Sequence, residues 1–249
     1  MTDVRASKEN GVLHLVMDRP GKKNALTGAM YHALSDGLDR AAGSDSIRAV
    51  LISGAGDAFS AGNDVADFLS SGASTAADAP SVRFILALTR FSKPLVAAVQ
   101  GNAVGIGTTM LLHCDLVFAD ETARFATPFS KLGLVPEAGS SLLLPARIGA
   151  VRANAMLLLG ETLDANAALS AGLVNAVLPA GTVLDHARKQ AETLAALPPA
   201  ALRASKALIQ GDRSALEARI DAELKAFGVA LRSEEARAAF NLFLSRPKS

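Results

Sequence analysis

Hydrophobic positions follow two patterns in the first half of the chain, short continuous runs and a helical period. Three short apolar runs are typical of buried strands, namely residues 11–18 (GVLHLVMD), 49–56 (AVLISGAG) and Leu95–Val99. Between the first two runs, the apolar positions of residues 27–42 follow a helical period, and Thr27 is a suitable N-cap. Strands that alternate with helices in this way predict a layered α/β fold.

The pattern changes along the second half of the chain. Residues 108–120 predict a short buried helix followed by a strand, whereas the small and polar residues 67–81 predict a mobile surface loop. From about Pro198 onward, only helical periods follow. We therefore divide the chain into an α/β core, residues 1–195, and a helical region, residues 196–249.

Composition narrows the functional classes. The chain has 249 residues, half of them hydrophobic, and a formal charge of +1 without a basic block, so nucleic acid is not the expected partner. Cys114 is the single cysteine, which excludes an intrachain disulfide. No apolar run reaches the roughly 18 residues of a membrane span. We expect a soluble cytoplasmic protein of one large domain, or of one domain with a small appendage.

Two glycine-rich turns follow predicted strands, at residues 56–65 (GDAFSAGNDV) and 100–107 (QGNAVGIG). Glycine permits unusual φ values and leaves main-chain N–H groups free to face a ligand, so two such turns can supply donors for one oxyanion. Turns that simply close α/β units are the other interpretation, and spacing alone favours it. Nucleotide binding fits poorly, because Met110 stands where the G-x-G-x-x-G motif needs its third glycine.

Other catalytic chemistry is poorly represented. The spacing of the four histidines matches no metal-binding motif, so we expect no metal site; they are His14, His32, His113 and His186. His113 lies in an apolar segment, which predicts a histidine of the core. Ser140 and Ser141 follow Gly139 but form no G-x-S-x-G motif, which favours local packing or capping.

Glu137 is the only acid in residues 131–145 (KLGLVPEAGSSLLLP), a segment that predicts a buried helix. An acid after Pro136 at a helix start has an ordinary explanation, because it interacts favourably with the helix dipole by about 0.3–1 kcal/mol. Its apolar neighbours would also desolvate the carboxylate and make it a stronger base. Both interpretations stay open on the local sequence.

Taken together, these segments resemble the crotonase superfamily, also called the enoyl-CoA hydratase/isomerase family. The similarity extends over nearly the whole chain in the order of the family, and it is carried by residues 18–27, 59–65, 93–120, 124–149, 171–179, 205–209 and 233–248. The resemblance implies a spiral of ββα units followed by C-terminal helices that form homotrimers, usually paired as homohexamers. It also implies an acyl-CoA thioester substrate, with coenzyme A entering as part of the substrate and no permanently bound cofactor.

The resemblance also assigns residues. The thioester oxygen would lie between the main-chain N–H groups of Asn63 and Ile106. The residues expected along the coenzyme A groove are Lys22, Lys23, Asn24, Ala61, Gly62, Asp64, Val65, Gly105 and Lys206. The three lysines would meet phosphates, with solvation at the surface as the alternative. The acyl pocket is expected near residues 67–81, Phe84, Phe91 and Phe129.

The acidic residues at the positions that match the family indicate which of its reactions to expect. Hydratases of this family resemble one another in two glutamates, and here those positions hold Thr109 and Phe129. The dehalogenase branch needs a tryptophan, which this chain lacks. Glu137 matches the acid of the Δ3,Δ2-enoyl-CoA isomerase branch, so we expect an isomerase with Glu137 as its single base. The alternatives are an enoyl-CoA hydratase, another CoA isomerase of the family, and an inactive acyl-CoA-binding protein.

Overall fold

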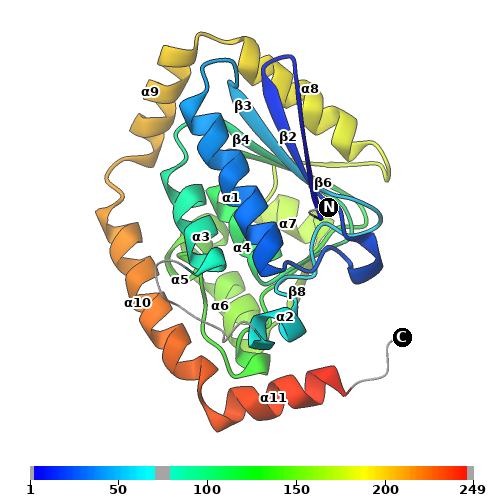
Figure 1. Cartoon of the computed structure of the whole chain (residues 1–249), viewed down its shortest axis with the longest axis vertical. Coiled ribbons are helices and arrows are strands. Elements are labelled where there is room, and N and C mark those ends of the chain that lie inside the picture. The colour runs from blue at the N-terminus through cyan, green and yellow to red at the C-terminus, as the bar shows by residue number, and fades with distance from the viewer. Residues whose placement is uncertain (1–2, 71–78, 246–249) are drawn as a thin grey trace.

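The computed structural model describes residues 3–70 and 79–245 (Figure 1). Its main sheet contains six strands in the spatial order β1 (Val4–Glu9), β2 (Val12–Met17), β3 (Ala49–Gly54), β4 (Leu95–Val99), β6 (Leu116–Asp120) and β9 (Ala176–Leu178). β1 and β2 form an antiparallel hairpin whose two-residue turn, Asn10–Gly11, has positive φ at both positions, as type I′ turns require. All other neighbours in this sheet are parallel.

A second sheet lies beyond the carboxyl ends of the main strands. It contains β5 (Asn102–Val104), β7 (Arg124–Ala126) and β8 (Thr162–Asp164). The chain passes from β4 to β5 and from β6 to β7 through short turns, and helical segments follow each pair. This repeat of two strands and a helix confirms the predicted α/β spiral of ββα units.

Two isolated β-bridges add residues from earlier in the sequence to the edge of the second sheet. Leu26 pairs with Asn63, and Ser60 pairs with Ala103 of β5, both in parallel orientation. Residues 60–63 therefore occupy the position of a strand beside β5. As a result, the two glycine-rich turns, far apart in the sequence, lie next to each other.

Helices cover both faces of the main sheet (Figure 1). On one face, α8 (Val183–Ala196) packs with small residues onto Leu51 and Val96. On the other face, α1 (Gly28–Gly43) packs onto Val50 and Ile52, and α3 (Pro80–Arg90) packs beside α1. The predicted helix at residues 27–42 is confirmed, and Thr27 caps it by accepting a hydrogen bond from the Met30 N–H at 3.3 Å.

The described residues form further helices, of which α4 (Ile106–Thr109) is entirely buried. The others are α2 (Val65–Ser70), α5 (Ser140–Ile148), α6 (Ala150–Leu159), α7 (Ala165–Ala171), α9 (Pro199–Gln210), α10 (Ser214–Leu231) and α11 (Glu234–Leu244), with 3₁₀ turns at Pro20–Lys22, Met110–His113 and Ser130–Leu132. The helices predicted after Pro198 are confirmed, and α9, α10 and α11 follow one another along the outside (Figure 1).

Two predicted segments differ from the structure. Residues 131–145 are not one helix, because Gly133, Ala138 and Gly139 have positive φ and α5 begins only at Ser140. Glu137 therefore lies in an irregular segment ahead of the helix. The predicted loop at residues 67–81 is helical at its two ends, in α2 and α3, and its residues 71–78 lie outside the described part of the chain.

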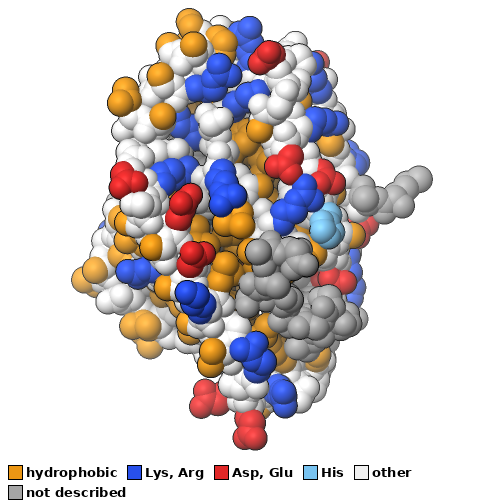
Figure 2. All heavy atoms as spheres, turned by 60° about the vertical axis from the view of Figure 1, so that its left-hand side comes forward, with side chains coloured by type: hydrophobic (Ala, Val, Ile, Leu, Met, Phe, Trp, Pro, Cys, Tyr) orange, Lys and Arg blue, Asp and Glu red, His pale blue; other side chains and the backbone are white. Residues whose placement is uncertain are grey.

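Several large hydrophobic side chains are exposed on the outer helices. Leu208 and Ile209 of α9 are 84% and 86% exposed, and Figure 2 shows hydrophobic side chains over the side of the molecule where α9 and α10 lie. Among the described residues, no helix has both the length and the apolar character needed to cross a membrane.

Candidate active site

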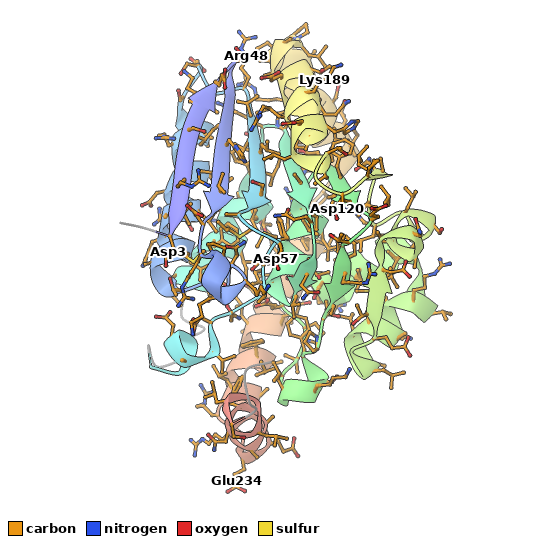
Figure 3. All side chains as sticks on the ribbon, turned by 90° about the vertical axis from the view of Figure 1, so that its right-hand side faces the viewer. Asp3, Arg48, Asp57, Asp120, Lys189 and Glu234 are labelled. Carbon is orange, nitrogen blue, oxygen red and sulfur yellow. The ribbon has the colours of Figure 1, made fainter. Side chains whose placement is uncertain are left out.

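The site lies at the carboxyl ends of the main parallel strands. Figure 3 shows Arg48 at the end of the sheet where β3 begins, and Asp57 and Asp120 at the opposite end, where β3 and β6 finish. Both glycine-rich turns leave the sheet at this second end. Open parallel sheets bind ligands at this edge, because the loops that follow their strands converge there.

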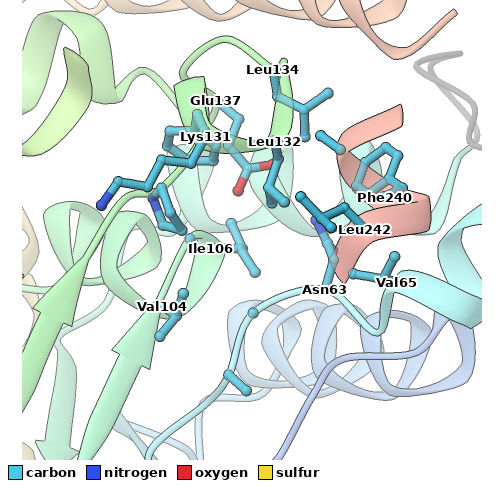
Figure 4. A pocket seen from close by; sticks show the side chains of 16 residues that line it. Asn63, Val65, Val104, Ile106, Lys131, Leu132, Leu134, Glu137, Phe240 and Leu242 are labelled. Atoms are coloured by element: carbon cyan, nitrogen blue, oxygen red, sulfur yellow. The ribbon is translucent and has the colours of Figure 1, made fainter. Parts of the chain in front are cut away.

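A cavity of about 310 Å³ opens beside the two turns (Figure 4). Its walls come from four stretches of the chain, and the lining residues are Ala61, Gly62, Asn63, Val65, Val104, Gly105, Ile106, Pro128, Phe129, Lys131, Leu132, Leu134, Glu137, Ala239, Phe240 and Leu242. The structure thus brings together seven of the site residues that the sequence indicates, namely Ala61, Gly62, Asn63, Val65, Gly105, Ile106 and Glu137. Most of the other lining residues are apolar.

The N–H groups of Asn63 and Ile106 donate no hydrogen bond to any described residue. Their neighbours do: Asp64 N–H donates to the Leu26 oxygen at 2.9 Å, and Gly105 N–H donates to the Ala126 oxygen at 2.9 Å. The backbone around Asn63 and Ile106 is therefore held in place while these two donors stay free. Such preorganised donors are suited to stabilise a developing negative charge.

Gly62 makes the close approach of the two turns possible. Its φ is +87°, and a Cβ atom at this position would lie 2.7 Å from the main-chain oxygen of Val104. Only glycine combines this conformation with such a contact at low cost. The requirement explains why the first turn carries glycine directly before Asn63.

Glu137 carries the only carboxylate among the described residues that line the cavity. Its side chain is 6% exposed, and Figure 4 shows the carboxylate pointing toward the centre of the cavity, on the side of Ile106. Burial, and secondly the negative charge of Glu223, raise its pKa from the usual 4.5 to about 8. Its Oε1 atom has no hydrogen-bond partner among the described residues. Glu137 is thus a desolvated carboxylate with a raised affinity for protons.

Two residues behind the cavity walls, Glu223 and Tyr31, were not indicated by the sequence, and a third, His113, was expected only as a core residue. Glu223 of α10 accepts hydrogen bonds from the segment that carries Glu137, and Tyr31 of α1 donates its hydroxyl hydrogen to the side-chain oxygen of Asn63. His113 was predicted as a core histidine, and its Nε2 donates to the Ala138 oxygen at 2.8 Å. Burial lowers the pKa of His113 to about 4, so the ring is neutral at neutral pH.

Residues 7–249 match the family model described as enoyl-CoA hydratase/isomerase. The chain belongs to the enoyl-CoA hydratase/isomerase family. It is 38% identical to enoyl-CoA delta isomerase 2 of Rattus norvegicus over 249 residues, which cover 98% of this chain but only 63% of that protein. It is 34% identical to 2,3-dehydroadipyl-CoA hydratase of Escherichia coli K12, covering 99% of this chain and 97% of that one.

The crystal structure of an enoyl-CoA hydratase/isomerase from Pseudoalteromonas atlantica T6c has the same fold. It superposes with a TM-score of 0.93 and 42% identity, and the match covers 99% of each chain. Enzymes of the enoyl-CoA hydratase/isomerase family act on coenzyme A thioesters. The chain is therefore an acyl-CoA enzyme of this family, in which isomerases and hydratases share one fold.

Within this family fold, Lys206 does not take the place that the sequence predicted. Its side chain is buried, and its ammonium donates to the Lys93 oxygen and to the Asp115 carboxylate, both at 2.7 Å. A buried ammonium with these partners is not available to a coenzyme A phosphate. This pairing argues against the predicted phosphate contact of Lys206, and the sequence pattern alone could not reveal Asp115 as its partner.

Asn24 is also internal rather than a groove residue. Its side chain is fully buried, and its amide donates to the main-chain oxygens of Ala55 and Ala58 at 2.8 Å each. Its Oδ1 accepts from the Arg19 N–H at 2.8 Å. Asn24 therefore ties the turn after β2 to the glycine-rich turn after β3, and its side chain is not exposed to a ligand.

The other predicted groove residues lie near the cavity but outside its walls. Lys22 and Lys23 are exposed, and the Lys23 ammonium forms an ion pair with Asp57 at 2.6 Å. Asp64 pairs with Arg19 at 2.6 Å and accepts hydrogen bonds from the first N–H groups of α2. Phosphate contacts by Lys22 and Lys23 remain a prediction, whereas Asp64 has a structural partner.

The apolar wall of the cavity is formed by residues that the sequence only partly indicated. Phe129 lines the cavity as expected, but Phe84 and Phe91 are buried in the core on the side of α1. Phe240 and Leu242 of α11 complete the wall instead. The Lys131 ammonium donates to the Gly160 oxygen at 2.8 Å, and Figure 4 shows it pointing away from Glu137.

Proposed function

We propose that this protein is a Δ3,Δ2-enoyl-CoA isomerase. The observation that supports the proposal best is the single buried carboxylate of Glu137, which shares one cavity with two free main-chain N–H groups. A double-bond shift needs one group that removes a proton and returns it elsewhere, together with donors that stabilise the charge formed in between. It needs no activated water.

The proposed reaction proceeds in two proton transfers. Glu137 takes a proton from C2 of a 3-enoyl thioester, and the electron pair of that C–H bond moves onto the conjugated system and the thioester oxygen. The N–H groups of Asn63 and Ile106 bind this oxygen; one such donor contributes about 2.7–4 kcal/mol to transition-state stabilisation. Glu137 then returns the proton to C4, which leaves the double bond between C2 and C3.

The electrostatics of Glu137 suit this role. A general base is most effective when its pKa lies near the working pH, and burial raises the pKa of Glu137 to about 8. The neighbouring wall is apolar, with Leu132 and Leu134 beside the carboxylate (Figure 4). Exclusion of water strengthens the interaction between the charged intermediate and the two donors.

The substitution Glu137→Gln tests the proposal. It keeps the size of the side chain and removes the base, so turnover of a 3-enoyl-CoA should fall by about 10²–10⁴-fold. The matched control is Glu121→Gln, which removes an exposed carboxylate outside the cavity and should keep wild-type turnover. Wild-type turnover by Glu137→Gln would contradict the assigned mechanism.

Hydration is the second candidate, and the full-length similarity to the Escherichia coli hydratase supports it. Against it, Thr109 is fully buried and Phe129 is apolar, so neither position offers a carboxylate to activate water. Incubation with crotonyl-CoA separates the two reactions, because a hydratase forms 3-hydroxyacyl-CoA. An inactive binding protein would instead retain acyl-CoA tightly and turn over no member of a thioester panel.

We also propose that the chain forms homotrimers, or hexamers built from them. The exposed Leu208 and Ile209 of α9 and the exposed Leu158 and Leu159 of α6 support this proposal, because apolar side chains of this size are commonly covered in assemblies. Light scattering coupled to size-exclusion chromatography tests it. A monomeric mass at micromolar concentration would contradict the proposal.

A further inference from the structure

The segment that carries Glu137 has an unusual backbone. Ala138 and Gly139, which follow Glu137 directly, have φ values of +57° and +72°. A left-handed alanine is uncommon in proteins and persists only where its surroundings hold it. The conformation of this short turn must therefore be imposed by contacts with other elements.

One such contact comes from α10. Glu223, 6% exposed, accepts hydrogen bonds through both carboxylate oxygens: from the Gly139 N–H at 2.6 Å, the Ser141 N–H at 2.9 Å and the Ser141 hydroxyl at 2.5 Å. α10 also packs directly on the turn, because a Cβ atom on Gly139 would lie 2.4 Å from Leu216 Cδ1. Charge-assisted bonds of this kind are short and directional.

The second contact comes from the opposite side. His113 donates from Nε2 to the Ala138 oxygen at 2.8 Å, and that oxygen belongs to the same peptide group as the Gly139 N–H. The peptide plane between Ala138 and Gly139 is therefore held at its oxygen by His113 and at its nitrogen by Glu223. This double attachment restricts rotation of the peptide and so limits the backbone conformations of the turn that begins at Glu137.

The Glu137 carboxylate has little other support. Its Oε1 atom makes no hydrogen bond to a described residue, and the nearby cavity wall is apolar. We propose that Glu223 is a positioning residue for catalysis: by binding the N–H groups of Gly139 and Ser141, it holds the turn that aims Glu137 at the substrate carbons. This inference rests on the proposed function of Glu137 as the base.

The charge of Glu223 has a second effect, on the affinity of Glu137 for protons. Three other groups face the carboxylates of Glu137 and Glu223: Arg219 of α10, the neutral His113 and Tyr31 of α1. The Arg219 Nη1 donates to the Ser141 hydroxyl at 3.3 Å. Glu223 is the charged group that raises the pKa of Glu137, after burial. Removal of its charge should therefore lower the pKa of Glu137.

Glu223→Gln tests the proposal, with kcat and KM measured on a 3-enoyl-CoA between pH 5 and pH 9 (about the range that brackets both states of the base). Glutamine offers one oxygen and an amide that cannot accept from an N–H, so one of the two main-chain bonds is lost. We expect kcat to fall by about 10- to 100-fold with KM nearly unchanged, because misplacement by about 1 Å costs this much. The acid limb of the kcat/KM profile should move to lower pH.

Glu217→Gln is the matched control, since it removes an exposed carboxylate from the same helix. It should leave kcat and the pH profile unchanged. If Glu223→Gln does not fold, as judged by circular dichroism, Ser141→Ala takes its place. That variant removes the hydroxyl donor of the same network and should lower kcat by a smaller factor.

The outcomes separate this inference from the proposed function. If Glu137→Gln is inactive while folded Glu223→Gln keeps wild-type kcat and an unshifted acid limb, the positioning role is wrong and the base assignment stands. Wild-type kcat in Ser141→Ala overturns the positioning role in the same way when Glu223→Gln cannot be studied. If Glu137→Gln itself keeps full turnover, the assignment of the base fails first.

Discussion

The hydroxyl group of Tyr31 donates a hydrogen bond to the side-chain oxygen of Asn63, the residue that offers one of the two free N–H groups. Tyr31 is 3% exposed and lies in α1, and its ring contacts that of Phe84 at a centroid distance of 5.7 Å. This hydrogen bond attaches the Asn63 side chain to α1, which is part of the helical layer that covers the main sheet. The proposed oxyanion site therefore depends on α1 as well as on the two glycine turns.

Tyr31→Phe should weaken catalysis without unfolding the protein. Phenylalanine keeps the packing on Phe84 and leaves the Asn63 oxygen without its donor. The net value of a hydrogen bond, about 0.5–1.5 kcal/mol, corresponds to a loss of about 2- to 13-fold in kcat/KM on a 3-enoyl-CoA. Unchanged kcat/KM in a variant with wild-type melting temperature would show that Asn63 is held without Tyr31.

The activity should depend on pH through Glu137. A base must be deprotonated to act, and the pKa of Glu137 in the free protein is raised to about 8 by burial and by Glu223. The kcat/KM for a 3-enoyl-CoA should therefore rise with pH up to a midpoint near pH 8. A profile that is flat from pH 6 to pH 9 would speak against a buried carboxylate as the base.

The same pKa shift predicts that the base destabilises the fold. Since the pKa rises from 4.5 in the unfolded chain to about 8 in the folded one, the folded state retains the proton and stability falls as pH rises through this interval. Glu137→Gln should remove this loss of unfolding free energy. At about 1.4 kcal/mol per pKa unit, the loss in the wild-type protein reaches about 4 kcal/mol at pH 8. Urea unfolding of both proteins at pH 5 and pH 8 measures it. A gain that is equal at both pH values would refute the electrostatic origin.

Gly62→Ala should damage both stability and activity. The new Cβ would meet the Val104 oxygen at 2.7 Å in a residue with φ of +87°, which forces apart the two turns that carry Asn63 and Ile106. We expect a loss of about 1–3 kcal/mol in unfolding free energy and a large fall in kcat. Gly43→Ala is the control, because its Cβ would meet no atom within 4 Å. Equal behaviour of the two variants in thermal melts would contradict the close-approach argument.

The fold could be predicted where local patterns and tertiary contacts agree. The strands at residues 11–18, 49–56 and Leu95–Val99 are fully or largely buried, so their continuous apolar character was informative. The segment around Glu137 could not be predicted in this way. Its composition favours a helix, but the left-handed Ala138 is imposed by α10 and His113, which are distant in sequence.

The same distinction applies to the site. Glu137, Asn63 and Ile106 could be proposed as site residues because the segments that carry them resemble the family, whereas the local sequence alone left their roles open. Glu223 lies 82 or more residues from its partners and has an ordinary helical context, so no local signal marks it. Lys206 shows the opposite error, because a lysine in a tail segment looks exposed until its pairing with Asp115 is known.

The cavity walls come from positions between Ala61 and Leu242, and no single segment contains the whole site. Binding and folding are consequently coupled over most of the chain. An acyl-CoA present at 100 times its dissociation constant should add about 2.7 kcal/mol to the unfolding free energy by mass action. Because the cavity walls include both the glycine turns and α11, slowed hydrogen exchange on binding should extend from these turns to the C-terminal helix.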